Sequence, residues 1–287
     1  MSRATTAPPR NRSALGRRRA TLAGAASLAL GLLGGTLPAA AAEDDPPDVT
    51  EIVERANNAA YYAGDDGRAQ ARMRIVDEQG RTQTRQFTIL RRDESDGGDQ
   101  DFLVAFSRPS EYRGVVFLVE KHPGGGDDRW LYLPSQDLKR RIAPGDKRTS
   151  FVGSHVFYED VSGRDIHNDT YELLETTEEH YKIRAVPKDD EDDVEFSSYT
   201  MWIDRVTYLP MTTEYKDEDG EVYRRMESSD IETIDGHPTP MRMRVEDEDM
   251  GGYTEVQFRG QAYDIGVPAD VFSDRSLRNP PRQWLSR

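Results

Sequence analysis

Short segments in which apolar and polar residues alternate follow one another along most of this 287-residue chain. In the first, Ala71, Met73 and Ile75 alternate with Arg72 and Arg74. Successive side chains of a β-strand point to opposite faces, so a period of two predicts a strand with one apolar face. A turn at 78–80 and a returning strand through 87–89 follow. Further strands are predicted at 101–107, 114–120, 130–133, 171–176, 181–186, 198–203, 211–216, 222–228, 239–245 and 253–258.

One segment near the start has the periodicity of a helix instead. Apolar residues recur at helical spacing over 49–60, and Asp48 and Glu51 before them have the spacing of a capping box. A second, short helical segment is expected near 153–161. Strand after strand with one early helix predicts a mainly β fold of the α+β kind, with a single antiparallel sheet curled around a core.

The first 42 residues are typical of a cleavable export signal. Arg17, Arg18 and Arg19 precede a weakly hydrophobic stretch and a run of alanines that suits a signal peptidase, with cleavage expected before Glu43. The arginine pair favours the twin-arginine route over the ordinary secretory route, and the glycines in the stretch disfavour an uncleaved anchor. We therefore expect a signal peptide at 1–42, a linker at 43–47, and one domain at 48–287 that works in the periplasm.

The chain is strongly acidic, which excludes several classes of partner. Its net charge is −15, and loss of the six arginines of the signal segment would make it −21. Such a surface disfavours nucleic acid and anionic lipid surfaces. The acidic run at 189–193 is interpreted as a solvated surface suited to high salt rather than a metal site. Cysteine is absent, which excludes disulfides, thiolate metal sites and a lipid-bearing cysteine.

Catalytic signatures are weak, and we predict no catalytic residue, metal site or cofactor. The five histidines form no HExxH motif, and no GxSxG elbow is present. Ser154 and His155 are adjacent in sequence, but adjacency alone does not put a hydroxyl and an imidazole in catalytic geometry. Acidic residues are so numerous that paired carboxylates have no diagnostic value, which leaves a glycoside hydrolase open.

Four blocks of sequence resemble a known family. They are GVVFLVE at 114–120, WLYLP at 130–134, RRI at 140–142 and SFVGSHVFYEDV at 150–161. These blocks, together with MWIDRVTYLPMTTEYKDEDG from Met201 and IETIDGHPTPMRM from Ile231, are similar to the outer-membrane lipoprotein-sorting proteins, a LolA-like group often found with exporters of the resistance-nodulation-division (RND) type. The resemblance covers roughly Ile52 to Leu277.

The resemblance implies a half-open β-barrel of the LolA/LolB kind, with an N-terminal helix and a short helical lid over a cavity for acyl chains of lipoproteins or lipids. An inner-membrane RND-type transporter is an expected partner, and the protein is expected to be a monomer. Candidates for the cavity wall are Met73, Ile75, Phe87, Ile89, Phe102, Val104, Phe106, Phe117, Trp130, Tyr132, Met241 and Met243. Candidates for a lid or flap are Phe151, Gly153, Ser154, Phe157, Tyr158 and Asp160.

Each of these assignments has an alternative. The wall residues would equally suit a closed core against the helix at 49–60, Trp130 and Tyr132 would suit either core or rim, and the segment at 151–160 would suit an ordered plug as well as a movable flap. Three functions remain in order of preference. They are a periplasmic lipid or lipoprotein carrier, a transporter-associated interaction module without cargo, and a hydrolase with a buried polar cleft.

Overall fold

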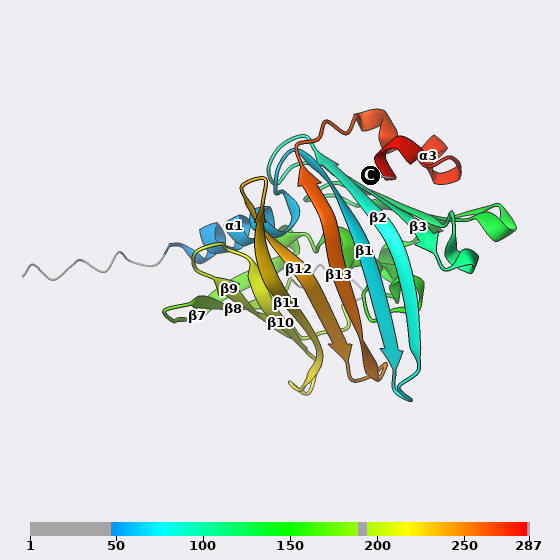
Figure 1. Cartoon of the computed structure of the whole chain (residues 1–287). Helices are drawn as coiled ribbons and strands as arrows, with labels where there is room; N and C mark the ends of the chain where they lie inside the picture. The colour runs from blue at the N-terminus through cyan, green and yellow to red at the C-terminus, as the bar shows by residue number, and fades with distance from the viewer. Residues whose placement is uncertain (1–46, 189–193, 286–287) are drawn as a thin grey trace, which may run out of the picture. The chain divides into compact units, whose positions relative to one another are not determined.

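The computed structural model describes residues 47–188 and 194–285, which form one 13-stranded antiparallel sheet with a few short helices (Figure 1). The predicted signal peptide, nearly all of the predicted linker and the acidic run at 189–193 lie outside the described residues. The prediction of a mainly β fold with a single curved antiparallel sheet is confirmed. The strands are β1 (Asp66–Asp77), β2 (Thr82–Asp93), β3 (Gln100–Arg108), β4 (Val116–Lys121), β5 (Asp128–Leu133), β6 (Leu138–Ile142), β7 (Asp169–Thr176), β8 (His180–Pro187), β9 (Ser198–Asp204), β10 (Pro210–Lys216), β11 (Val222–Ile234), β12 (His237–Asp247) and β13 (Gly252–Tyr263).

The helices are few and most are a single turn. The α-helices are α1 (Val49–Tyr61), α2 (Tyr158–Ser162), α3 (Asp274–Arg278) and α4 (Arg282–Leu285). The 3₁₀ turns are η1 (Ser110–Tyr112), η2 (Pro134–Gln136), η3 (Pro144–Asp146), η4 (Phe151–Gly153), η5 (Ile166–Asn168) and η6 (Ala269–Val271). None of the helices in the described part of the chain is long and apolar enough to cross a membrane.

The strand order explains which segment crosses the open side of the sheet. That order is β6-β5-β4-β3-β2-β1-β13-β12-β11-β10-β9-β8-β7, so β1 and β13 pair in the middle and β6 and β7 form the two edges. The two edge strands are consecutive in sequence. The connection at 143–168, which contains η3, η4, α2 and η5, must therefore span from one edge to the other instead of forming a hairpin.

Strand β6 was missed in the sequence, where Leu138–Ile142 reads LKRRI without alternation. Only Ile142 in this strand is buried. An edge strand has one side without a pairing partner, and charged residues there oppose pairing with other chains. The charged residues that protect this edge therefore interrupt the apolar–polar alternation from which a strand would be predicted.

Helix α1 begins where the sequence predicts, although its cap differs from the predicted box. The carboxylate of Asp48 accepts a hydrogen bond from the amide of Thr50 at 2.8 Å, which satisfies one free donor of the first turn. Glu51 instead pairs with Arg55 one turn later at 3.6 Å. Ile52 and Val53 are buried against an apolar cluster from β8 and β9. The helix thus covers the β7 end of the sheet.

The sheet has two differently covered faces. We call the face that carries Met73, Val104 and Val245 the inner face, since α1 and the connection at 143–168 pack on it. The opposite, outer face carries Leu90 and Leu103, which pack under Val267 and Leu277 of the C-terminal segment. Figure 1 shows the C-terminal helices beside this half of the sheet, where α3 contacts β4 and β5 and α4 contacts β2. Each half of the sheet is therefore buried on at least one side.

Candidate functional site

A cavity of about 370 Å³ lies on the inner face between α1, the segment 156–164 and the sheet. Its size is within the range of about 300–1,000 Å³ that small-ligand pockets have. Apolar side chains make most of its wall, among them Met73, Phe87, Ile89, Phe102, Val104, Val156, Met226, Met243, Val256 and Phe258. The end of α1 closes one side through 59–61, and we call this space the inner cavity.

Half of the predicted wall residues line the inner cavity. They are Met73, Phe87, Ile89, Phe102, Val104 and Met243, and they come from β1, β2, β3 and β12. Ile75, Phe106 and Phe117 lie on the same face but belong to a packed cluster rather than to the cavity lining. The inner face therefore has a filled core in one region and a cavity beside it, but that core closes on Phe151 and Tyr158 and not, as the alternative from the sequence expected, on the helix at 49–60.

Three predicted wall residues do not belong to this wall. Trp130 and Tyr132 lie on the outer face, where they pack with the C-terminal segment, and between them Leu131 points inward. The assignment of this pair to the cavity wall was wrong and the alternative of core packing holds. Alternation predicts that neighbouring side chains face opposite sides of the sheet, but it does not predict which of them faces the cavity. Met241 is half-buried and lines neither the inner cavity nor the packed cluster.

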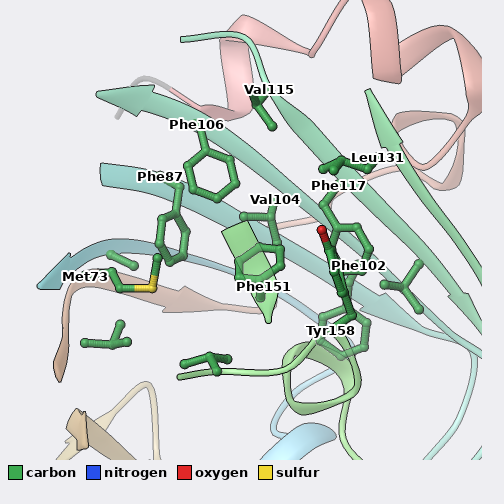
Figure 2. Close-up of a cluster of buried hydrophobic side chains, with 14 of the residues drawn as sticks. Met73, Phe87, Phe102, Val104, Phe106, Val115, Phe117, Leu131, Phe151 and Tyr158 are labelled. Atoms are coloured by element: carbon green, nitrogen blue, oxygen red, sulfur yellow. The ribbon is translucent and has the colours of Figure 1, made fainter. Parts of the chain in front are cut away.

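Phe151 fills the packed part of the inner face, as Figure 2 shows. Its ring lies 5.4 Å from the ring of Phe117, 5.7 Å from that of Phe106 and 5.4 Å from that of Tyr158 in an edge-on contact. Such tilted and edge-on pairs are the favourable aromatic geometries. Phe151 is 2% exposed, so this part of the predicted lid is an anchor buried in the core.

The backbone around Phe151 turns sharply. Val152 and Gly153 have φ of 49° and 78°, and a Cβ added at Gly153 would meet no atom within 4 Å. The conformation rather than crowding therefore favours glycine there. Ser154 is fully buried and its hydroxyl donates to the carbonyl of Phe151 at 2.8 Å, which closes the turn.

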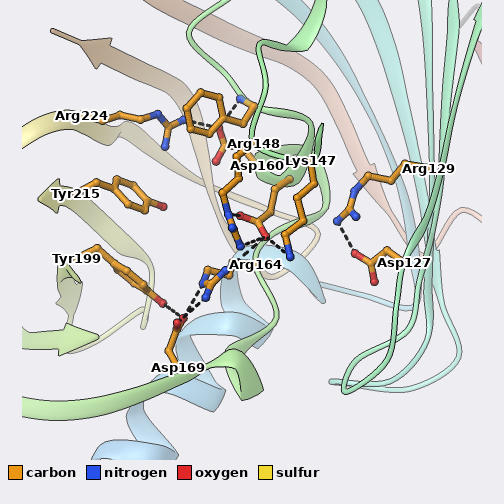
Figure 3. A network of polar contacts seen from close by, with 12 residues as sticks. Asp127, Arg129, Lys147, Arg148, Asp160, Arg164, Asp169, Tyr199, Tyr215 and Arg224 are labelled. Atoms are coloured by element: carbon orange, nitrogen blue, oxygen red, sulfur yellow. Dashed lines mark hydrogen bonds and ion pairs between the residues drawn. The ribbon is translucent and has the colours of Figure 1, made fainter. Parts of the chain in front are cut away.

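A buried ion pair ties the same segment to the other half of the sheet (Figure 3). The guanidinium of Arg224 in β11 pairs with the carboxylate of Asp160 in α2 and lies 4.1 Å from the ring centre of Phe157. Asp160 also accepts from the amide of Phe157 at 2.7 Å. Arg224 is 1% exposed and Asp160 is among the predicted lid residues, whereas Arg224 was not predicted.

Glu159, next to Asp160, is surrounded by three cations. Arg148 donates to it at 3.0 Å, and Lys147 and Arg164 lie 3.6 Å away. Burial by itself would raise the pKa of Glu159, but these three cations lower its pKa below the ordinary value. Arg164 also binds Asp169 at 2.7 Å, which links α2 to β7. None of these basic partners was predicted, although Lys147, Arg148 and Arg164 belong to the same connection at 143–168 as Glu159, because no motif in that connection indicates which side chains pair.

The side chain of His155 is held by hydrogen bonds within the fold. Its Nδ1 is 2.9 Å from the hydroxyl of Thr254, and its Nε2 is 3.1 Å from the carbonyl of Gly251. Ser154 binds elsewhere, so the two side chains do not form a hydroxyl–imidazole pair. Among residues 47–188 and 194–285, no group of three or more histidine, aspartate or glutamate side chains is arranged to hold a metal ion.

The sequence and the fold of this chain were each compared with those of known proteins. Residues 98–279 match a protein-family model whose description is "Uncharacterized protein". No curated protein matches the chain in sequence. Among solved structures, the chain is similar to a DUF1329 family protein from Desulfovibrio piger ATCC 29098, with 27% identity and a TM-score of 0.71 over 80% of this chain and 95% of that one.

Two other similar structures share less sequence but the same fold. A putative outer membrane lipoprotein-sorting protein domain from Vibrio parahaemolyticus is 23% identical, with a TM-score of 0.72 over 79% of this chain and 97% of that one. A LolA superfamily protein from Nitrosomonas europaea is 17% identical, with a TM-score of 0.62 over 79% and 98%. The expected half-open, LolA-like fold is therefore confirmed.

Proposed function

This chain belongs to the family whose model matches residues 98–279 and has the LolA-like fold, and from this premise we propose that it is a periplasmic, non-enzymatic carrier of acyl chains. Its cargo would be a lipid or the acyl chains of a lipoprotein, held in the inner cavity. The observation that carries the proposal is the apolar wall of that cavity, which includes Phe102, Val104 and Met243.

Transfer energies explain why such a carrier needs this wall. Burying one methylene is worth about 0.8 kcal/mol, so a chain with roughly 14 methylenes is held in a bilayer by about 11 kcal/mol. A protein that removes the chain must offer an equally dry apolar surface. Met73, Met226 and Met243 add flexible, polarizable contacts that adapt to chains of different shape.

The export signal at 1–42, the linker at 43–47 and the carrier domain at 48–287 belong to the same proposal. Delivery to the periplasm by the twin-arginine route would place the cavity between the membranes, where acyl cargo has to cross water. An RND-type transporter of the inner membrane is the proposed partner, and the carrier is proposed to act as a monomer.

A second function is favoured by one observation. Phe151 already fills the part of the inner face between Phe106 and Phe117, as a closed core would require. An envelope interaction module that binds a transporter without cargo would need only such a filled core. Under this second hypothesis, the remaining cavity never holds an acyl chain.

Two neighbouring serines allow a matched test. Ser228 lines the inner cavity and pairs with Met243 across the strands, whereas Ser229 is exposed and pairs with Arg242 on the outer face. Ser228→Trp should fill the cavity, and Ser229→Trp adds the same side chain outside it. Binding of a fluorescent fatty acid, and mass spectrometry of lipid extracted from protein purified from its own periplasm, would be compared for both variants.

The carrier predicts bound acyl lipid in the wild type and in Ser229→Trp, with at least a tenfold loss of fatty-acid affinity in Ser228→Trp, equal to about 1.4 kcal/mol. Equal unfolding midpoints would show that both variants fold. A wild-type protein that carries no lipid and takes up no fatty acid would overturn the carrier and leave the interaction module.

A further inference from the structure

A second cavity, of about 580 Å³, lies on the outer face of the sheet. Its floor is formed by β1, β2, β3 and β13, and its sides by the loop at 113–114 and by residues of the C-terminal segment 280–285. The hydroxyl of Thr88 donates to the carbonyl of Leu285 at 3.3 Å, which fixes the C-terminal side against the floor. The sheet separates this cavity from the inner cavity, and we call it the outer arginine pocket.

All charged residues that line this pocket are arginines. They are Arg72, Arg113, Arg259 and Arg282, and no aspartate or glutamate lines it. This is unexpected in a chain with 53 acidic and 38 basic residues. The polar lining that remains consists of Gln70, Gln86, Thr88 and Ser107, and the hydroxyls of Thr88 and Ser107 donate to the carbonyls of Leu285 and Gln86. The pocket is therefore a local positive site on an acidic protein.

The strand register brings two of these arginines together. Gln70 of β1 lies opposite Arg259 of β13, and Arg72 follows Gln70 two residues later on the same face. Residues in such a diagonal relationship are about 7–8 Å apart, close enough for two guanidinium groups to reach one ligand. Arg113 approaches from the η1–β4 connection, and Arg282 from α4.

Three of the four guanidinium groups are not neutralised. The side chains of Arg72, Arg113 and Arg259 have no hydrogen-bond or ion-pair partner among residues 47–188 and 194–285. Arginines on the neighbouring strand β12 do have counter-charges. Arg242 pairs with Asp230 at 3.0 Å, and Arg244 pairs with Glu246. The positive charges of these arginines repel one another at this spacing. Binding of an anion would relieve that repulsion, so it is favourable.

We propose that the outer arginine pocket binds a phosphate group, either of a soluble phosphate ester or of a lipid headgroup. The planar fork of a guanidinium group donates two parallel hydrogen bonds to such an oxyanion. A phosphate monoester carries nearly two negative charges at neutral pH, whereas the phosphodiester of a lipid headgroup carries one, and either group offers several acceptor oxygens to the arginines. This site is distinct from the inner cavity and does not depend on the proposed carrier function.

The test uses the soluble anion first. Mature wild-type protein is titrated with inorganic pyrophosphate at low salt in an isothermal titration calorimeter. We expect saturable binding. The double variant Arg72→Gln/Arg259→Gln should bind at least about tenfold more weakly, since each lost charge-assisted bond weakens the complex. Both residues are exposed, so the variant should fold, and its unfolding midpoint checks this.

The double variant Arg184→Gln/Arg205→Gln is the matched control. Both arginines are exposed and lie at β8 and just after β9, far from the pocket in the strand order, and their loss changes the net charge by the same two units without touching the lining. The affinity of this control for pyrophosphate should equal that of the wild type. Equal weakening in this control would mean that binding reflects net charge alone and would overturn the site.

Flotation with vesicles separates the two sources of phosphate. Wild-type protein that floats with vesicles of phosphatidylglycerol but not of phosphatidylcholine, and loses this in Arg72→Gln/Arg259→Gln, would identify a lipid headgroup as the ligand. Pyrophosphate binding without flotation would identify a soluble phosphate ester. Wild-type protein that binds neither probe would overturn the proposal.

Discussion

Arg224 and Asp160, 64 residues apart in the sequence, form a buried ion pair that fixes α2 to β11 across the inner face. The pair connects the half of the sheet that begins at β7 with the segment that carries Phe151 into the other half. Arg224 also donates to the carbonyl of His155 at 3.3 Å. One side chain thus holds both ends of the short segment at 155–160.

Removing either charge of this pair should destabilise the protein strongly. Arg224→Met or Asp160→Asn leaves a buried group without its partner, for which we expect a loss of about 3–5 kcal/mol in the free energy of unfolding. The double variant should lose less than the sum of the two single losses. Urea denaturation measures all three, and Arg225→Met, which removes an exposed pair with Glu214, should cost at most about 1 kcal/mol. Strict additivity would contradict a direct interaction.

Phe151→Ala should open the packed part of the inner face. Deleting a buried phenyl ring typically costs about 3–5 kcal/mol and leaves a cavity. Because Phe87, which contacts Phe151, also lines the inner cavity, we expect the two spaces to join and longer acyl chains to bind more tightly than to the wild type. Affinities for fatty acids of increasing length check this. Unchanged length dependence would show that the space closes after the substitution.

Asp101→Asn should stabilise the protein above neutral pH. Burial, followed by repulsion from Glu120 directly opposite on β4, raises the pKa of Asp101 to about 6. A carboxyl group whose pKa is raised on folding costs stability above that pKa, and the cost fades as the pH falls toward its unfolded value near 3.8.

Since Asp101 is partly exposed, solvent screening limits the expected gain to about 1 kcal/mol at pH 8. Thermal unfolding of Asp101→Asn should therefore show a higher midpoint than the wild type at pH 8 and the same midpoint near pH 3.5. A gain that does not depend on pH would point to packing instead of charge.

Glu159→Gln should have the opposite pH dependence. Arg148, Arg164 and Lys147 lower the pKa of Glu159 despite its burial. Its ionised form therefore stabilises the fold above its ordinary pKa of 4.5, and this contribution is lost as the pH falls through the lowered value. The wild type should unfold at a higher temperature than Glu159→Gln at pH 7, and the difference should shrink in acid. A constant difference down to the acid transition would show that protonation of Glu159 does not contribute.

The sequence predicted most elements of this fold because their signals are local. Twelve strands and the start of α1 follow from alternation, turns and the cap residue Asp48. Strand β6 was the exception, since its residues 138–142 show the charges of an edge and no alternation. The block at 150–161 marked the segment that crosses the inner face, but it did not show that Phe151 is an anchor.

The sequence by itself determined where the strands lie, that one helix precedes them, and that the chain is acidic and resembles lipoprotein-sorting proteins. These properties depend on neighbouring residues and on composition. Only the tertiary structure decided that Leu131 faces inward while Tyr132 faces outward, that Arg224 meets Asp160, and that Arg72 and Arg259 share a pocket. Such contacts join residues far apart in the chain, and their geometry is set by the sheet's register and curvature, which no local pattern records.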